Sequence, residues 1–165
     1  MALTLKQIAD VLGISRSRVD QWISRRYFTT PDTPRLGMSR EWDASDALRL
    51  AVMNALLHRG VPANIAGDAV SANLPLYETE RSFLALWAGY IKTATAGVRT
   101  YNPDHTHVAF LRESEVAEFV LDQNVRSVLL LDVDAIANQV TESLQRLDNF
   151  KKSVERAGAT FDEGE

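Results

Sequence analysis

Five polar side chains near the start of the chain have the chemistry to read nucleic-acid bases. An arginine guanidinium can donate two hydrogen bonds to guanine, and a glutamine amide can pair in a similar way with adenine. At helical spacing these side chains fall on a different face from Val19, Trp22 and Ile23, which we expect to be buried. The alternative is an ordinary solvated helix face. The candidate residues are Arg16, Ser17, Arg18, Gln21 and Arg25.

Two short helices joined by a glycine turn are expected to position this polar face. The first is expected over Leu3–Leu12, because Thr4 and Gln7 have the spacing of a capping box and apolar residues follow at helical intervals. Gly13 suits the positive φ required just past a helix end, and Ser15 can cap the second helix. A helix, a glycine turn and a second helix with a basic face are typical of a helix-turn-helix.

The segment after the second helix predicts a small hairpin, or wing. Two short extended arms, residues 27–30 and 35–38, flank a turn bounded by prolines. Asp43 is then expected to cap a third helix, which Gly60 ends. Pro62 begins a short fourth helix, where its fixed φ suits the first turn.

Four short patterns in this region are specific. They are the opening Leu3–Ala9 run, the Gly13–Ser15 turn, Arg40–Trp42 ahead of the capped helix and the His58–Ile65 junction. Together they make residues 3 to about 70 resemble the winged helix-turn-helix domain of the MerR family. In that family the second helix enters the major groove and the wing touches the sugar-phosphate backbone. The resemblance therefore implies base contacts near Arg16, Ser17, Arg18 and Gln21, and backbone contacts near Arg35 and Arg40.

The second helix departs from the family pattern, which usually has an arginine followed by two aromatic residues. This chain has Val19-Asp20-Gln21-Trp22 instead. Asp20 either accepts a hydrogen bond from a cytosine amino group or pairs with a neighbouring arginine, and helix geometry favours the ion pair. Phage excisionases and small terminase subunits share the winged architecture, so it implies DNA binding more firmly than transcription.

Composition favours a soluble, cytoplasmic protein that associates with the nucleoid through DNA. The 165 residues are 45% hydrophobic, include no cysteine and carry a net charge of −4. The sequence has no apolar run long enough to span a membrane, and its start lacks the pattern of a signal peptide. Without cysteine there is no disulfide, thiolate metal site or thiol sensor, which separates this chain from the metal-sensing branch of the MerR family.

Charge is distributed unevenly along the chain. Residues 1–40 hold seven basic and three acidic residues, whereas residues 71–165 hold nine basic and fifteen acidic ones. This asymmetry predicts a basic end that faces DNA and an acidic remainder turned away from phosphate. One copy can neutralise only a few phosphates, so we expect tight binding to need two copies on the DNA.

The second half matches no family pattern, and its apolar runs predict a small α/β domain. Residues 83–91 are interpreted as a strand, with a buried helix as the alternative. Residues 107–111 and 126–132 are expected to be strands, the latter buried on both faces. A short helix with a capped start is expected over residues 114–121.

A long amphipathic helix is expected at the end of the chain, capped by Asp134. Its apolar residues recur in steps of three and four and predict a seam for a partner helix, in the same chain or in a second copy. In the MerR family a long helix after the DNA module forms an antiparallel coiled coil between two copies, although this helix lies further along the chain. The predicted dimerisation residues are Ile136, Val140, Leu144 and Leu147.

The expected fold class is α+β, an N-terminal MerR-like winged helix-turn-helix followed by a small α/β domain ending in a long amphipathic helix. The expected boundaries are 1–72 for the DNA-binding domain, 78–157 for a dimerisation or assembly domain and 158–165 for a flexible tail.

Residues with catalytic or metal-binding chemistry form no recognisable site. For His105 and His107 a solvated loop is favoured over a metal site. His58 suits the last turn of a helix, and Trp87 and Tyr90 suit a core. There is no glycine-rich phosphate loop and no nucleophile elbow. We expect no enzyme activity, no cofactor and no bound metal.

The resulting hypothesis is a bacterial or phage transcription regulator that binds double-stranded DNA sequence-specifically as a homodimer. The alternative is the DNA-recognition subunit of a phage packaging or recombination complex, of the small terminase or excisionase type. A small-molecule effector stays open, because no residue pattern identifies one.

Overall fold

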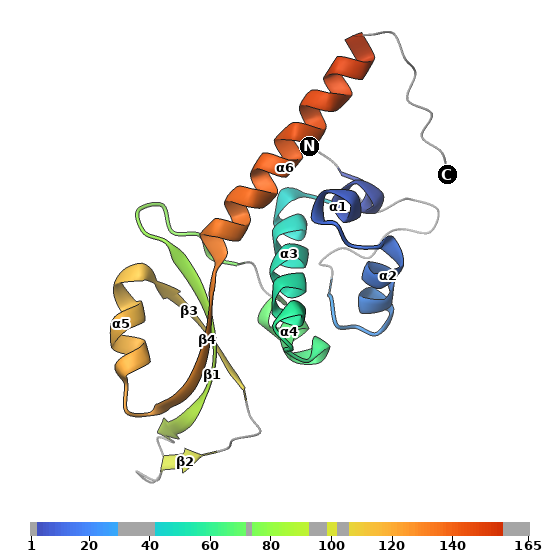
Figure 1. Ribbon diagram of the computed structural model, residues 1–165. Helices are drawn as coiled ribbons and strands as arrows, with labels where there is room; N and C mark the ends of the chain where they lie inside the picture. Colours follow the sequence, from blue (N-terminus) through green and yellow to red (C-terminus); the bar gives the residue numbers. More distant parts are fainter. Residues whose placement is uncertain (1–2, 30–41, 72–73, 93–98, 102–105, 157–165) are drawn as a thin grey trace.

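The computed structural model describes residues 3–29, 42–71, 74–92, 99–101 and 106–156. A cluster of helices α1 to α4 lies beside a small antiparallel sheet, and the long helix α6 runs from the sheet past the cluster (Figure 1). This is the expected α+β class. Within these ranges no helix is long and apolar enough to span a membrane.

The described residues between 3 and 71 form four helices in the predicted order. They are α1 (Leu5–Leu12), α2 (Arg16–Ser24), α3 (Ala44–His58) and α4 (Ala63–Ala69). The predicted capping box is confirmed, since Gln7 N–H donates to Thr4 Oγ1 at 3.3 Å and Thr4 N–H donates to Gln7 Oε1 at 2.9 Å. Gly13 has a φ of +63°, so the glycine turn between α1 and α2 is also confirmed.

Helix α3 is the central helix of this part. Asp43 caps it as predicted, with its Oδ1 accepting Asp46 N–H at 2.8 Å. Gly60, with a φ of +82°, follows its end, and Pro62 occupies the N-cap of α4. A backbone bridge joins Leu3 to Trp42, so the start of the chain is held beside the start of α3.

The sheet is built around β1 (Ser82–Lys92). It lies between β3 (His107–Arg112) and β4 (Val125–Asp132), antiparallel to both, and its last residues pair with β2 (Arg99–Tyr101). The strand interpretation of residues 83–91 is therefore confirmed.

The two faces of the sheet pack against different parts of the molecule. Leu84 lies opposite Phe110 on β3 and Leu131 on β4, and this inner face joins the core shared with the helices. Helix α5 (Glu113–Leu121) covers the outer face, where Trp87 packs edge-on against Phe119 with ring centroids 5.7 Å apart.

The strand expected over residues 107–111 is confirmed as β3, whereas two other expectations were wrong. His107 lies in β3 with its ring 4.8 Å from the Trp87 ring, rather than in a solvated loop, because strand pairing with β1 places it over the outer face. Strand β4 is not buried on both faces: Leu131 is buried, but Arg126 and Ser127 are exposed. Within the described residues β4 pairs only with β1, so it forms an edge that the helices cover incompletely.

Helix α6 (Val133–Arg156) begins one residue before the expected cap. The capping residue is Asp132, whose Oδ1 accepts Ala135 N–H at 2.9 Å, and not Asp134 as expected. Asp134 instead accepts the backbone N–H of Ser82, and Asp132 also pairs with Arg81. These carboxylates therefore fix the start of α6 to the start of β1.

The first half of α6 packs against α3 and α1 of its own chain. Val140 is buried there, and Ile136 and Leu144 pack against the same core. The second half continues beyond the body of the molecule, and Phe150 on it is 57% exposed (Figure 1). One continuous core thus joins the two parts, while the end of α6 extends away from both.

Candidate nucleic-acid interface

Helix α2 has one buried face and one exposed polar face, as predicted. Val19 and Trp22 are buried and Ile23 packs partly against the same core. The aromatic ring of Trp22 and the branched side chain of Val19 therefore fix the rotation of α2 on α1, and the remaining face must point to solvent. The side chains exposed on that face or directly after it are Arg16, Ser17, Arg18, Gln21 and Arg25.

Asp20 pairs with Arg16 across one helical turn, with 3.8 Å between Oδ2 and Nε. The predicted ion pair is therefore confirmed. Both side chains are more than half exposed, so the pair contributes only about 0.3–0.5 kcal/mol and a phosphate or base could replace the carboxylate at little cost. Ser15 stands at the N-cap position but makes no side-chain cap hydrogen bond; its hydroxyl accepts from Ser17 instead.

The chain leaves α2 through a left-handed residue. Arg26 has a φ of +59°, and the N–H groups of Tyr27 and Phe28 both donate to Trp22 O, at 2.8 and 3.1 Å. This reversal normally favours glycine. It exposes the Arg26 side chain beside Arg25. Arg25 and Arg26 are adjacent in the sequence, and this adjacency was the available signal for a second exposed basic side chain just after α2.

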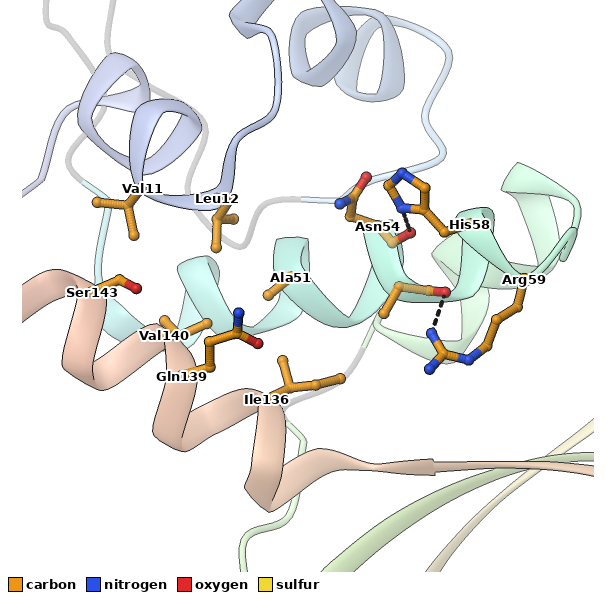
Figure 2. Close-up of a pocket in the computed structure, with 11 residues that line it drawn as sticks. Val11, Leu12, Ala51, Asn54, His58, Arg59, Ile136, Gln139, Val140 and Ser143 are labelled. Carbon is orange, nitrogen blue, oxygen red and sulfur yellow. Dashed lines mark hydrogen bonds between the residues drawn. The ribbon is translucent and has the colours of Figure 1, made fainter.

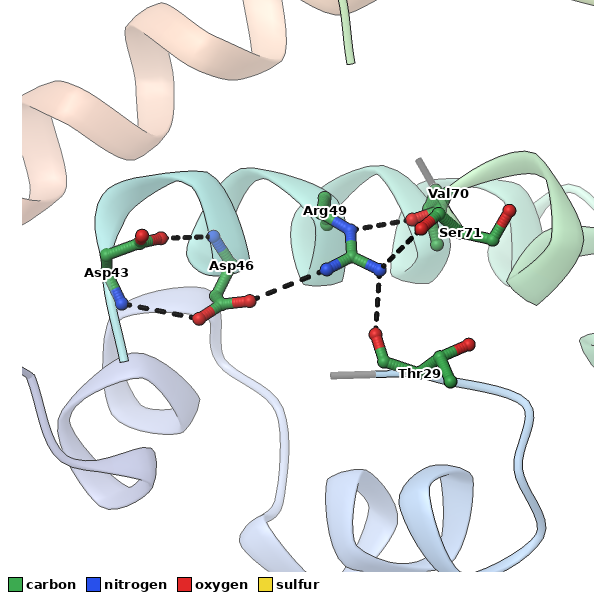
Figure 3. Close-up of polar contacts among 6 residues, drawn as sticks. All are labelled: Thr29, Asp43, Asp46, Arg49, Val70 and Ser71. Atoms are coloured by element: carbon green, nitrogen blue, oxygen red, sulfur yellow. Dashed lines mark hydrogen bonds and ion pairs between the residues drawn. The ribbon is translucent and has the colours of Figure 1, made fainter. Parts of the chain in front are cut away.

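A buried arginine holds the exit of α2 against the other helices (Figure 3). Arg49, on α3, is only 3% exposed and donates from Nε to Val70 O at 2.7 Å. Its Nη2 donates to Thr29 O at 2.8 Å and to Ser71 O at 3.3 Å. Its Nη1 lies 3.5 Å from Asp46 Oδ1. Arg49 therefore joins the segment after α2 to α3 and to the end of α4.

Sequence reasoning missed Arg49. The available signal was its position within the apolar stripe of α3, between Leu48 and Leu50, where a surface arginine is out of place. Its guanidinium also lies over the Phe28 ring, 4.7 Å from the centroid. The residue thus positions the helix-turn-helix without belonging to the exposed face.

Helix α4 makes a second close contact with the exit of α2. A Cβ added at Gly67 would lie 1.8 Å from Tyr27 O. Only glycine permits this approach of the two backbones. Gly67 and Arg49 together hold residues 27–29 against α3 and α4.

Residues 30–38 of the predicted wing lie outside the described residues, and so do Arg35 and Arg40; the described start of its first arm, residues 27–29, forms no strand. Of the predicted dimerisation residues, Val140 is buried in its own chain and Ile136 and Leu144 pack against the same core. Leu147 is half-buried on the next turn of α6.

Metal-ligating residues do not gather in the described part of the chain, where no group of three or more His, Cys, Asp or Glu side chains could hold an ion. His58 lies in the last turn of α3, as predicted, with its Nδ1 2.8 Å from Asn54 O.

Comparison with known proteins identifies the helical part. Residues 3–66 match the family model described as MerR HTH family regulatory protein. The match runs from the start of the chain into α4 and confirms the resemblance over that segment. None of the curated proteins compared with the chain matches it significantly.

Proposed function

Because the chain begins with a helix-turn-helix of the MerR type, we propose that it is a transcription regulator that binds double-stranded DNA through the exposed face of α2. The observation that carries this proposal is the division of α2 into a buried apolar face and an exposed face rich in arginine. A helix fixed in this way can present base-reading side chains in one orientation, which sequence recognition in the major groove requires.

Arg18 and Gln21 are proposed to contact base edges. They are one turn apart on the exposed face, and their side chains match guanine and adenine respectively. Arg16 and Ser17 begin the helix and would contact bases or the adjacent backbone. Arg25, at the helix end, would contact phosphate.

Residues 30–41 are proposed to supply further backbone contacts. The resemblance to the MerR family implies such contacts near Arg35, in the predicted wing, and near Arg40, which follows it. The basic balance of residues 1–40 supports this assignment, since sequence-independent affinity comes mainly from phosphate neutralisation. The acidic second half would face away from the duplex. A regulator of this kind would act at the nucleoid in the cytoplasm.

We further propose that two copies bind together through α6. Ile136, Val140 and Leu144 already pack against their own chain, so the contact between copies would use the turns from Leu147 onward. These turns extend beyond the body of the molecule (Figure 1). Such a dimer would place two α2 helices on half-sites about 34 Å apart, one helical turn of DNA.

Selection from a random pool of duplexes tests the function as a whole. The expected result is an enriched motif with two inverted half-sites, and footprinting should show protection repeated at one-turn spacing. An unenriched pool would contradict sequence-specific binding. A closed ring or larger oligomer in solution, measured by mass, would instead favour a subunit of a packaging or recombination complex.

A further inference from the structure

A hollow of about 280 Å³ lies where the helix-turn-helix meets α6 (Figure 2). The end of α1 forms one wall through Val11 and Leu12, and α6 forms the opposite wall. Ala51 and Ala55, one turn apart on α3, line the space between the walls. Small side chains on α3 therefore leave room between two helices that belong to different parts of the molecule.

The residues that line the hollow form an apolar centre, and all the ionisable side chains among them are basic. Leu12, Ile136 and Val140 supply apolar surface. The ionisable side chains among the lining residues are His58 and Arg59, both basic, and no carboxylate is among them. Neutral hydrogen-bonding groups complete the edge: Asn54 from α3 and Gln139 and Ser143 from α6.

Among the described residues, Arg59 donates a hydrogen bond from its Nη1 to Ala55 O at 2.9 Å. A guanidinium carries five N–H donors in a planar fork, so this bond orients the group and leaves donors on it that an anion could accept. Arg59 also lines a second hollow of about 370 Å³, between the start of α4 and the sheet. Its charge therefore lies at the junction of the two parts of the molecule.

We propose that the hollow between α1, α3 and α6 binds a small monocarboxylate with a compact apolar or aromatic body. The body packs against Ala51, Ile136 and Val140, and the carboxylate accepts hydrogen bonds from Arg59. The absence of acidic residues among the lining residues favours an anion over a cation. The volume is at the small end for ligand pockets, which favours a ligand smaller than a typical drug.

Such a ligand contacts α1 and α6 at once, so its affinity depends on how the helix-turn-helix sits against the long helix. By linkage, any ligand that prefers one arrangement shifts the molecule toward it and changes the affinity for DNA. This regulatory step depends on the proposed function, whereas binding in the hollow does not.

Titration of the full chain with benzoate, followed by two-dimensional amide NMR, tests the site, with benzamide as the uncharged match. Benzoate should cause saturable shifts at Leu12, Ala51 and Val140, and benzamide should bind more weakly. Arg59→Gln should weaken benzoate binding by about tenfold or more, the loss expected for a hydrogen bond to a charged group, without affecting benzamide. Arg126→Gln, at an exposed arginine on β4, is the control and should change neither.

A second variant tests the space itself. Ala51→Leu should abolish binding of both probes while retaining the helical circular dichroism of the wild type. The proposal is wrong if neither probe saturates, if the shifts lie on the sheet, or if Arg59→Gln binds benzoate as the wild type does. It is also wrong if Ala51→Leu alters self-association and leaves probe binding intact, because the hollow would then belong to an interface between copies.

DNA binding separates the two proposals. Saturating benzoate should change the affinity for the selected duplex by about fivefold or more. Benzoate binding without such a change would overturn the regulatory step. If the protein binds benzoate in the hollow but binds no duplex, with or without benzoate, the proposed function is wrong. The proposed carboxylate site would still hold.

Discussion

Arg18 is the residue on which base recognition depends most directly. Its side chain is exposed on α2 and lies one turn from Gln21. We expect Arg18→Ala to weaken binding to the preferred duplex by about 1–3 kcal/mol, because a paired contact to guanine is lost. The melting temperature should stay unchanged, since the side chain is exposed. Fluorescence anisotropy measures the first effect and thermal denaturation the second.

A matched variant controls for the general loss of positive charge. Arg126→Ala removes an exposed arginine from β4, on the other part of the molecule, and should leave DNA affinity nearly unchanged. If Arg18→Ala binds the preferred duplex as tightly as this control, the recognition face of α2 has been assigned incorrectly.

We expect Arg49 to affect the stability of the fold, whereas Arg18 affects the affinity for DNA. Replacing it with methionine keeps the apolar stem but removes donors from the carbonyl groups of Thr29, Val70 and Ser71 and leaves Asp46 without its buried cation. We expect a loss of about 3 kcal/mol in the free energy of unfolding, measured with urea. Arg16→Met, at an exposed position on α2, should cost less than about 0.5 kcal/mol. Equal effects of the two substitutions would show that the Arg49 contacts contribute no more than a surface pair.

The packing of α4 on the exit of α2 is tested by adding one methyl group. Gly67→Ala would place a Cβ within 1.8 Å of Tyr27 O, so the two backbones must separate. We expect a destabilisation of about 1–3 kcal/mol, the usual range for overpacking in a close contact. DNA affinity should fall as well, because Tyr27, just after α2, must move. Ala63→Gly in the first turn of α4 is the control for helix propensity and should not alter DNA affinity beyond its small effect on folding.

The ends of the helices were predicted well from the sequence where a capping side chain or a glycine meets a strict requirement of the backbone. Thr4 with Gln7, Asp43, Gly13 and Gly60 each satisfy a helix end, and each boundary was predicted within a few residues. The same logic failed at the start of α6, because two aspartates stand two residues apart and either can cap a helix. Which of them does so depends on Ser82 and Arg81, which are distant in sequence.

The burial of the strands and the role of Arg49 could not be predicted, because both depend on contacts between residues that are distant in sequence. The apolar run of β4 looks the same whether a strand lies inside a sheet or at its edge, and only the pairing with β1 decides this. Arg49 finds its acceptors at residues 29, 70 and 71, which local patterns do not bring together. The exposed face of α2 was predictable because Val19 and Trp22 define its opposite side.

At the scale of the whole molecule, α6 connects both parts. An apolar seam indicates that a helix has a partner but not which one, and here the surroundings of the seam change along its length. Val140 is buried against the helices of its own chain, whereas the turns beyond Leu144 leave the body (Figure 1). A contact between copies at this far end would join two helix-turn-helix units without disturbing the core that holds each one.

Leu147→Glu tests that contact. The side chain is only half-buried within its own chain, so a carboxylate there should leave the monomer folded, but it would have to be desolvated between two copies. We expect dissociation of the dimer to become at least about tenfold more favourable in sedimentation equilibrium, as for a desolvation cost above about 1.4 kcal/mol. Binding to a duplex with two half-sites should weaken, and its salt dependence should fall toward that of one half-site. Leu121→Glu, at a leucine 82% exposed on α5, is the matched control and should change neither property. An unchanged dimer in Leu147→Glu would mean that two copies associate elsewhere or that the chain binds DNA as a monomer.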